Sequence, residues 1–301
     1  MDINLIGVPI RYGSGKNGAQ LGPEKLREYN IINALSVNEN VVYDLGDLYV
    51  PIYSEEDKYN WHDKMKFLEP VLDVNTNLAH MVYCSLKANS FPLVIGGDHS
   101  LGMGSIAGSS KFFKEIAVIW VDAHGDINNS DTSPSGNIHG MPLAASMGVG
   151  SDDLTDLYYK GQKVKPKNVY ILGARDLDPG EVTLAEELKL NLYTMETIRE
   201  SGLDILINEI IKKINSSTVD GVHLSFDIDA LDSSLVPGTG TRVAEGFTLN
   251  EGKSILKQFL STGFINSMDF VELNPMLDDD KESTANVCLE LIQDFAKYLK
   301  K

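Results

Sequence analysis

One segment of the sequence places acids and an imidazole at alternate positions. In IAVIWVDAHGDIN, an apolar run leads into Asp122, His124 and Asp126. Successive side chains of an extended chain point to opposite faces, so these three share one face, with neighbours about 6.5 Å apart. Carboxylates and imidazoles aimed at one point are typical of metal binding. The spacing therefore indicates a reactive site directly after a buried strand.

Two other apolar runs lead into the same residue types. His99 follows FPLVI in GGDHS, and Asp227 and Asp229 follow GVHLSF. In an open α/β sheet, ligands bind beyond the carboxyl ends of the strands, so we expect all these groups to converge there. Left bare, the carboxylates would repel, since two like charges about 4 Å apart cost roughly 4 kcal/mol at an effective dielectric constant of 20.

A pair of divalent cations would cancel the charge of four converging aspartates. Carboxylate and imidazole ligands without a thiolate suit manganese, zinc or iron, and the excess of oxygen ligands favours manganese. Each motif alone also has an ordinary explanation: DxHxD and DIDALD as solvated loops, and GGDHS as a turn with an Asp cap. Their joint occurrence favours the metal site. GSGKNG lacks the first Gly and the Ser or Thr of a phosphate-binding loop, and no GxSxG marks a nucleophilic serine.

The elements that must position these residues alternate along the chain. Residues 201–216 have the apolar period of a helix packed on a sheet, and the capping box in residues 248–251 opens another helix. Residues 283–300 predict a C-terminal helix. The stretch 55–89 has a helical pattern but contains Pro70, which we expect to kink or split it. The strand candidates are residues 3–9, 41–46, 91–97, 116–122, 168–174, 190–195, 221–228 and 265–273.

This alternation predicts an α/β fold. Strands that are apolar on both faces and separated by helices form a mostly parallel sheet that is covered on both sides. No internal repeat, low-complexity tract or linker divides the sequence. We therefore expect a single domain over residues 1–301, with a mostly parallel sheet of about eight strands and helices on both faces.

Composition and charge limit the kinds of molecule that the protein is expected to bind. The formal net charge of -17 argues against nucleic acids and anionic membranes, because both require clustered Lys and Arg, and favours cationic small molecules. Cys84 and Cys288 are far apart and form no CxxC pair, so neither a disulfide scaffold nor a cysteine zinc site is expected. We see no secretory signal pattern and no apolar stretch of about 18 residues, and expect a cytoplasmic protein without a membrane span.

Five motifs together resemble a known family. GGDHSLGMGS, WVDAHGDIN, SGNIHGMP, GARDLDPGE and SFDIDALD occur in this order across most of the chain and are similar to the motifs of the ureohydrolases, most of all those of the arginase branch. The resemblance implies a three-layer arginase-like fold and a binuclear manganese centre that hydrolyses a guanidinium group to urea and an amine. It also implies a homo-oligomer, a trimer or a hexamer.

The resemblance further assigns the metal ligands by matching positions. It implies that two Mn²⁺ ions per subunit lower the pKa of a shared water, and that the resulting hydroxide attacks the guanidinium carbon. One ion would be held by His99, Asp122, Asp126 and Asp227, and the other by Asp122, His124, Asp227 and Asp229, with Asp122 and Asp227 bridging.

Catalytic roles follow from the same resemblance. His139, in SGNIHG, matches a proton-shuttling histidine, and an ordinary imidazole pKa near 6.5 suits that task. Glu272, in DFVELNP, and Thr241, in PGTGT, match positions that hold the guanidinium; for Glu272 a buried structural acid is an almost equal alternative. Asp126 is expected to act in catalysis as well as in metal binding.

The substrate's amino-acid end has its own matches. Asn128, Ser133 and Ser135 match a loop that binds an α-carboxylate, and Asp178 and Glu181 match acids that face an α-ammonium. These residues favour L-arginine.

Two departures keep agmatine, or another guanidino compound, as an alternative substrate. Asp131 is an extra acid in the entry loop, and Ser233 stands where the family often has Pro. Two further alternatives are a two-metal phosphoesterase, which should bring Lys or Arg to the site, and a non-catalytic metal-binding protein, which should lack a ligand.

Overall fold

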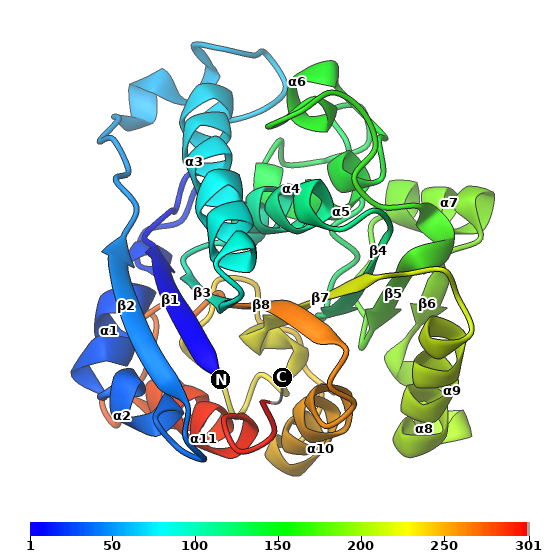
Figure 1. Ribbon diagram of the computed structural model, residues 1–301. Helices are drawn as coiled ribbons and strands as arrows, with labels where there is room; N and C mark the ends of the chain where they lie inside the picture. Colours follow the sequence, from blue (N-terminus) through cyan, green and yellow to red (C-terminus); the bar gives the residue numbers. More distant parts are fainter. Residues whose placement is uncertain (300–301) are drawn as a thin grey trace.

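A computed structural model describes residues 1–299 and contains one eight-stranded sheet in a single-domain α/β fold (Figure 1). Every strand pair in it is parallel, and the strand order is β2-β1-β3-β8-β7-β4-β5-β6. The expected sheet and all its strand candidates are thus confirmed. The strands are β1 (Asp2–Val8), β2 (Val41–Asp47), β3 (Phe91–Gly96), β4 (Ile116–Val121), β5 (Val169–Leu172), β6 (Asn191–Tyr193), β7 (Gly221–Asp227) and β8 (Ile265–Val271).

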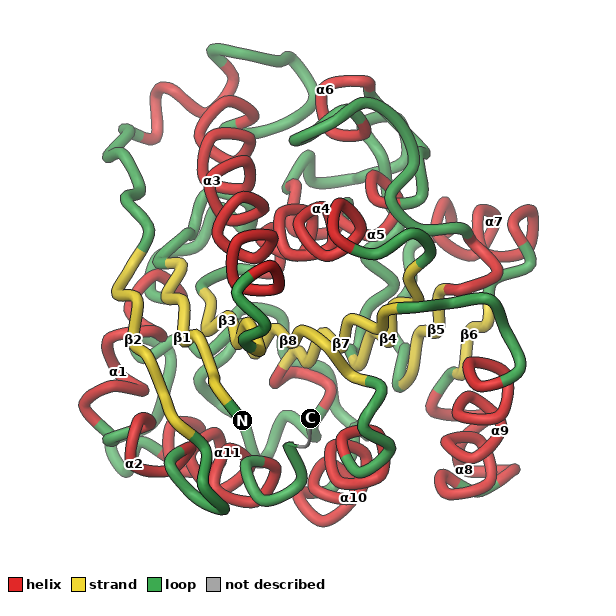
Figure 2. The backbone as a smooth tube through the Cα atoms, viewed as in Figure 1, coloured by secondary structure: helices red, strands yellow, loops and turns green. Residues whose placement is uncertain are grey.

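Helices cover both faces of the sheet, which gives the three expected layers (Figure 2). One face carries α3 (Leu68–Lys87), α4 (Gly102–Phe112), α5 (Pro142–Ser146) and α7 (Pro179–Leu188), with the short α6 (Asp152–Thr155) beyond them. The other face carries α1 (Gly22–Glu28), α2 (Ile31–Leu35), α8 (Met195–Ser201), α9 (Leu203–Asn215), α10 (Leu249–Leu260) and α11 (Ser283–Phe295). Within residues 1–299, the helices fall short of the length and apolarity that a membrane span requires.

The central strands are apolar on both faces because each face meets a helical layer. All residues of β3, β4 and β7 are buried. Along β4, Ile119 packs into the core beneath the sheet and Trp120, the next residue, into the core beneath α4 and α5. The edge strand β2 is different: Val41, Tyr43 and Leu45 stay exposed. Only the interior strands therefore have the continuous burial that parallel sheets favour.

Three of the expected helices differ at their ends. Residues 55–89 do not form one helix: a short 3₁₀ turn covers Glu55–Tyr59, and α3 begins at Leu68. Pro70 lies in the first turn of α3, where backbone N–H groups have no intrahelical partner, so the helix accommodates it; the stretch is divided before Leu68 and not at Pro70. Gly202, with φ 92°, separates α8 from α9 within the expected helix 201–216. α11 ends at Phe295, and residue 300 lies outside the described residues, as does the end of the expected domain at 301.

A buried polar pair joins α4 to the middle of the sheet. The Asp269 carboxylate on β8 lies 2.9 Å from Nε2 of His223 on β7 and accepts a hydrogen bond from Ser105 Oγ on α4 at 2.6 Å. His223 Nδ1 lies 2.8 Å from Ser267 Oγ. All of these side chains are 2% exposed or less, so their charge and polarity are compensated by protein groups and not by bulk water.

We expect Asp269→Ala to destabilise the fold strongly. Removing one partner of a buried, hydrogen-bonded pair leaves the other uncompensated and costs about 3 to 5 kcal/mol. Urea unfolding of the metal-free protein measures the change in free energy of unfolding without a contribution from metal affinity. A loss below about 1 kcal/mol would show that the pair contributes little to stability.

Candidate metal centre and substrate cavity

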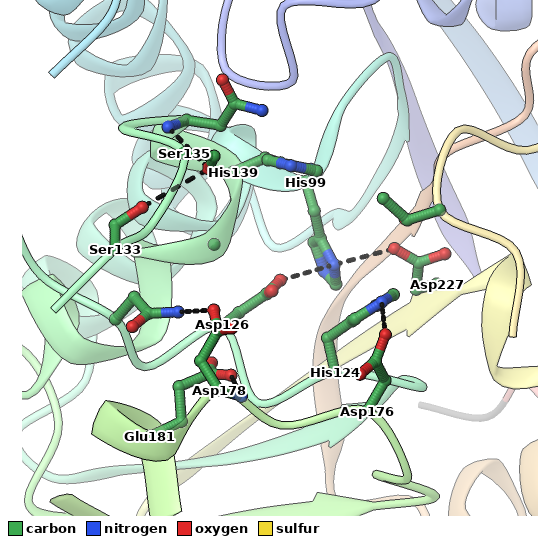
Figure 3. A pocket seen from close by; sticks show the side chains of 14 residues that line it. His99, His124, Asp126, Ser133, Ser135, His139, Asp176, Asp178, Glu181 and Asp227 are labelled. Carbon is green, nitrogen blue, oxygen red and sulfur yellow. Dashed lines mark hydrogen bonds and ion pairs between the residues drawn. The ribbon is translucent and has the colours of Figure 1, made fainter.

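The ends of neighbouring strands gather the expected acids and imidazoles. β3 leads into His99, β4 into residues 122–126, and β7 ends at Asp227. β8 lies between β3 and β7 in the sheet and leads into Glu272. His99, His124, Asp126 and Asp227 line one cavity of about 120 Å³ (Figure 3), whereas the expected residues Asp122, Asp229 and Glu272 lie outside its lining. Its lining includes His99, His124, Asp126, Asn128, Ser133, Ser135, His139, Asp178, Glu181, Asp227 and Thr241, all expected from the sequence.

The first ligand group surrounds one nitrogen of His99. Nδ1 lies 2.9 Å from Asp122 Oδ2, 3.1 Å from Asp227 Oδ2 and 3.2 Å from Asp126 Oδ2, yet it forms no hydrogen bond within the described residues. Two ligands at right angles around an ion about 2.1 Å from each lie about 3 Å apart. The buried nitrogen and the carboxylates around it could therefore hold one divalent ion.

The second ligand group shares Asp122 with the first. His124 Nδ1 lies 3.3 Å from Asp122 Oδ1 and 3.3 Å from Asp229 Oδ2. Asp122 thus presents Oδ2 to His99 and Oδ1 to His124, as a bridging carboxylate would. His99, Asp122 and Asp227 form one group that could hold a metal ion, and Asp122, His124 and Asp229 form the other. Asp227 belongs to the first group only.

Burial makes this acid cluster costly without a cation. Burial, followed by the charges of Asp229 and Asp122, raises the pKa of Asp227. Burial and Asp122 raise the pKa of Asp126 to about 6. For His99, burial acts to lower the pKa, but the surrounding carboxylates outweigh it and raise the pKa well above its ordinary value. Protons would otherwise compensate these charges, and divalent cations do so more completely.

Two residues outside the expected set orient His99. Its ring stacks on Trp120 with centroids 3.9 Å apart and an interplanar angle of 6°. Its Nε2 lies 2.8 Å from Ser225 Oγ, which leaves Nδ1 to face the carboxylates. Trp120 Nε1 also donates to Asp122 Oδ2 at 3.0 Å. Sequence reasoning missed both; Ser225 stands two residues before Asp227, on the same face of β7.

Two of the expected site residues have an unfavourable backbone conformation. Asp126 has φ 52° and Glu272 has φ 69°, in the left-handed region that is unfavourable for residues other than glycine. Such strain concentrates at functional sites. Gly97, just before the turn to His99, passes so close to the backbone of Ile10 that a Cβ would lie 1.8 Å from the Ile10 oxygen. The sequence contained no signal that Asp126 or Glu272 would have a positive φ.

Glu272 and His139 form a second pair beside the ligands. Glu272 Oε1 accepts a hydrogen bond from the His99 backbone N–H at 2.9 Å and lies 3.4 Å from His139 Nδ1. Burial acts to lower the pKa of His139, but Glu272 outweighs it and raises the pKa above its ordinary value. Asp98, a buried acid that the sequence analysis did not name, lies outside the cavity lining and accepts a hydrogen bond from the Gly13 backbone N–H at 2.9 Å.

The remaining expected residues form the outer part of the cavity. Asn128 Nδ2 donates to Asp178 Oδ2 at 2.8 Å, and the Ser133 and Ser135 hydroxyl oxygens lie 3.4 Å apart. Asp178 is the N-cap of α7 and forms a capping box with Glu181.

Three further residues complete the description of the lining. Burial raises the pKa of Glu181 to about 7. Thr241 Oγ1 donates to Asp229 Oδ2 at 3.0 Å. The lining also includes Asp176, an exposed acid that the sequence analysis did not name.

The two departures from the family pattern lie away from the cavity. Asp131 is 77% exposed in its side chain and pairs with Lys64 at 2.7 Å. Neither Asp131 nor Ser233 belongs to the cavity lining. The added acid is therefore neutralised at the surface and does not add negative charge beside Asn128 and Ser135.

Comparison with known proteins gives the family. The arginase family model matches residues 1–297. An arginase of Bacillus subtilis (strain 168) is 42% identical over 291 residues, which cover 97% of this chain and 96% of that protein. The chain belongs to the arginase family.

Solved structures of family members have the same fold. A crystal structure of arginase from Bacillus subtilis matches with a TM-score of 0.92 at 40% identity, covering 100% of this chain and 99% of that one. Entamoeba histolytica arginase in complex with L-ornithine matches with a TM-score of 0.89 at 32% identity, covering 98% of this chain and 97% of that one. The expected family and arginase-like fold are confirmed, while the roles of single residues stay predictions.

Metal loading should stabilise the protein through these ligands. We expect Mn²⁺ added after chelation to raise the melting temperature, since a ligand at 100 times its Kd stabilises a protein by about 2.7 kcal/mol. Asp229→Asn should remove most of this shift because it removes one ligand charge. Asp131→Asn, which makes the same change at the surface, should keep the full shift. Equal shifts in both variants, measured by differential scanning calorimetry, would place the ion elsewhere.

Proposed function

We propose that this protein hydrolyses the guanidinium group of L-arginine to urea and L-ornithine with two bound Mn²⁺ ions. The observation that carries this proposal is one cavity whose lining combines members of two ligand groups that share Asp122 with a separate set of polar partners, Asn128, Ser135 and Asp178. Family membership supports the same reaction, since the relatives compared above are named arginases and one is in complex with L-ornithine.

The donor set suits two hard divalent ions. When bound, the ions would supply a hydroxide nucleophile near neutral pH, because two metal ions lower the pKa of water between them. The proposed ligands are those expected from the sequence: His99, Asp122, Asp126 and Asp227 for one ion, and Asp122, His124, Asp227 and Asp229 for the other.

Acids of this chain bind and orient the planar guanidinium. Glu272 Oε1 is fixed by the His99 backbone N–H, and within residues 1–299 Oε2 forms no hydrogen bond, so Oε2 can accept from a guanidinium N–H. Thr241 belongs to the cavity lining, and its hydroxyl group donates a hydrogen bond to Asp229. Asp126 lines the same cavity, and its carboxylate would take the proton that the nucleophile loses on attack.

His139 would protonate the leaving amine. It lines the cavity, and the Glu272 carboxylate lies 3.4 Å from its Nδ1. Although burial acts to lower its pKa, Glu272 outweighs this effect and raises the pKa above the ordinary value, which favours the protonated ring that a general acid requires. A positioned imidazolium is an effective general acid because its pKa lies near the working pH.

The α-carboxylate and the α-ammonium group of L-arginine would each have partners in the cavity. Ser133, Ser135 and Asn128 would face the α-carboxylate, and Asp178, supported by Glu181, would face the α-ammonium. The hydrogen bond from Asn128 to Asp178 at 2.8 Å brings these two subsites together.

Other functions are less well supported. Agmatine has the same guanidinium but lacks the α-carboxylate for which Asn128 and Ser135 are suited. A two-metal phosphoesterase needs cationic partners, and the described lining of this cavity contains neither Lys nor Arg. A non-catalytic metal-binding protein should lack a ligand, whereas the ligand positions are all filled and lie together. A cytoplasmic location and a trimer or hexamer stay predictions.

We expect Mn²⁺-loaded protein to release urea from L-arginine much faster than from agmatine or guanidinobutyrate. Asp178→Asn, which keeps the size and the capping position, should raise the KM for L-arginine about tenfold, equivalent to about 1.4 kcal/mol. The melting shift on Mn²⁺ addition should stay as in the wild type. Urea from agmatine alone would make the substrate assignment wrong while leaving the hydrolytic chemistry intact.

His139→Asn should lower kcat by about 10²-fold or more and leave the KM for L-arginine nearly unchanged, since general acid catalysis contributes typically 10² to 10⁴ in rate. Steady-state urea release measures both constants. An unchanged kcat would assign the proton transfer to another group.

A further inference from the structure

One lysine lies directly behind the loop that contains Ser135. Lys66 Nζ donates a hydrogen bond to Asn137 Oδ1 at 2.9 Å, and the Lys66 backbone N–H donates to the Gly136 oxygen at 2.9 Å. Asn137 and Ser135 both belong to the cavity lining. Two hydrogen bonds thus attach Lys66 to the wall that would receive the substrate's α-carboxylate.

Lys66 is a partly buried cation without a counter-ion among the described residues. Within residues 1–299, no carboxylate oxygen lies within 4.0 Å of its Nζ, and its side-chain partner is the neutral amide of Asn137. Lys64, two residues earlier, is 55% exposed and pairs with Asp131. Burial and the neighbouring Lys58 lower the pKa of Lys66, and the more distant charge of Glu55, which acts to raise it, does not offset them.

Asn137 transmits the position of Lys66 to the cavity wall. Its Nδ2 donates to the Ser14 oxygen at 3.0 Å, and its backbone N–H donates to Ser135 Oγ at 3.2 Å. Lys66 thus contacts the amide oxygen of Asn137, and the backbone N–H of the same residue contacts the Ser135 hydroxyl oxygen. Asn137 therefore links the ammonium group to the hydroxyl group.

The acids of the cavity lining suggest a role for the positive charge of Lys66. Its charged lining residues include the acids Asp126, Asp176, Asp178 and Glu181, which attract a guanidinium and an ammonium but repel a carboxylate. An α-carboxylate seated at Ser135 would be the missing counter-ion of Lys66.

We propose that Lys66 is a specificity-determining and positioning residue that favours guanidino substrates with an α-carboxylate. Its hydrogen bond to Asn137 positions the part of the cavity wall that contains Ser135. Its positive charge attracts the α-carboxylate of the substrate. The inference rests on the proposed hydrolysis of L-arginine and deepens it, since it assigns a cation to a subsite for which the sequence indicated only neutral partners.

The test compares Lys66→Met with the wild type on two Mn²⁺-dependent reactions. The KM for L-arginine should rise about tenfold with kcat changed less than twofold. Agmatine, measured as substrate or as competitive inhibitor, should bind as tightly as before or more tightly, because it has no carboxylate. High salt should reduce the difference in KM, since screening weakens a charge effect.

Two variants separate charge from structure. Lys66→Arg keeps the cation and should restore most of the affinity for L-arginine. Lys87→Met makes the same change in net charge at an exposed lysine in the last turn of α3, outside the cavity lining, and should behave as wild type. Equal weakening of L-arginine and agmatine, or the same rise in KM in Lys87→Met, would overturn the role of Lys66. Wild-type protein that releases urea from agmatine but not from L-arginine would instead overturn the proposed function, and this inference with it.

Discussion

Electrostatic repulsion at one edge of the sheet is the constraint on which the rest of this structure depends. Asp122, Asp126, Asp227 and Asp229 are nearly or completely buried around two imidazoles, where bare charges are costly. The parallel sheet is what makes this gathering possible, because neighbouring strands end at the same edge. The fold therefore concentrates negative charge at a point where divalent cations and a cationic substrate can compensate it.

The surroundings of the cluster hold its geometry. Trp120 and Ser225 fix the His99 ring, and the His223–Asp269 pair beneath them belongs to the same buried polar region through a contact of 3.4 Å between Ser225 and Asp269. Outside the cluster, the loop at Ser135 is held by Asn137 and Lys66. In the proposed function, the acids near the ligands would attract the guanidinium of the substrate, and Lys66 near the outer wall would attract its α-carboxylate.

Local pattern was enough to find most elements. The strands were recognisable because burial on both faces requires continuous apolar runs, and the Thr248 capping box marked the start of α10 correctly. Helix ends were less predictable. Nothing local distinguished the irregular segment before Leu68 from helix, because tertiary contacts such as the backbone hydrogen bond from Phe67 to Lys58 decide its path.

The sequence by itself determined which groups would meet: His99, Asp122 and Asp227 follow buried strands, and parallel strands end together. Only the tertiary structure decided how they meet. The sharing of Asp122 between two ligand groups, the left-handed backbone at Glu272 and the pairing of Asp131 with Lys64 depend on side-chain directions and on segments far apart in the chain. The same holds for Lys66, whose significance comes from a neighbour 71 positions away. The spacing of residues along a strand determines which of them lie on the same face, whereas contacts between distant segments determine which partner each residue meets.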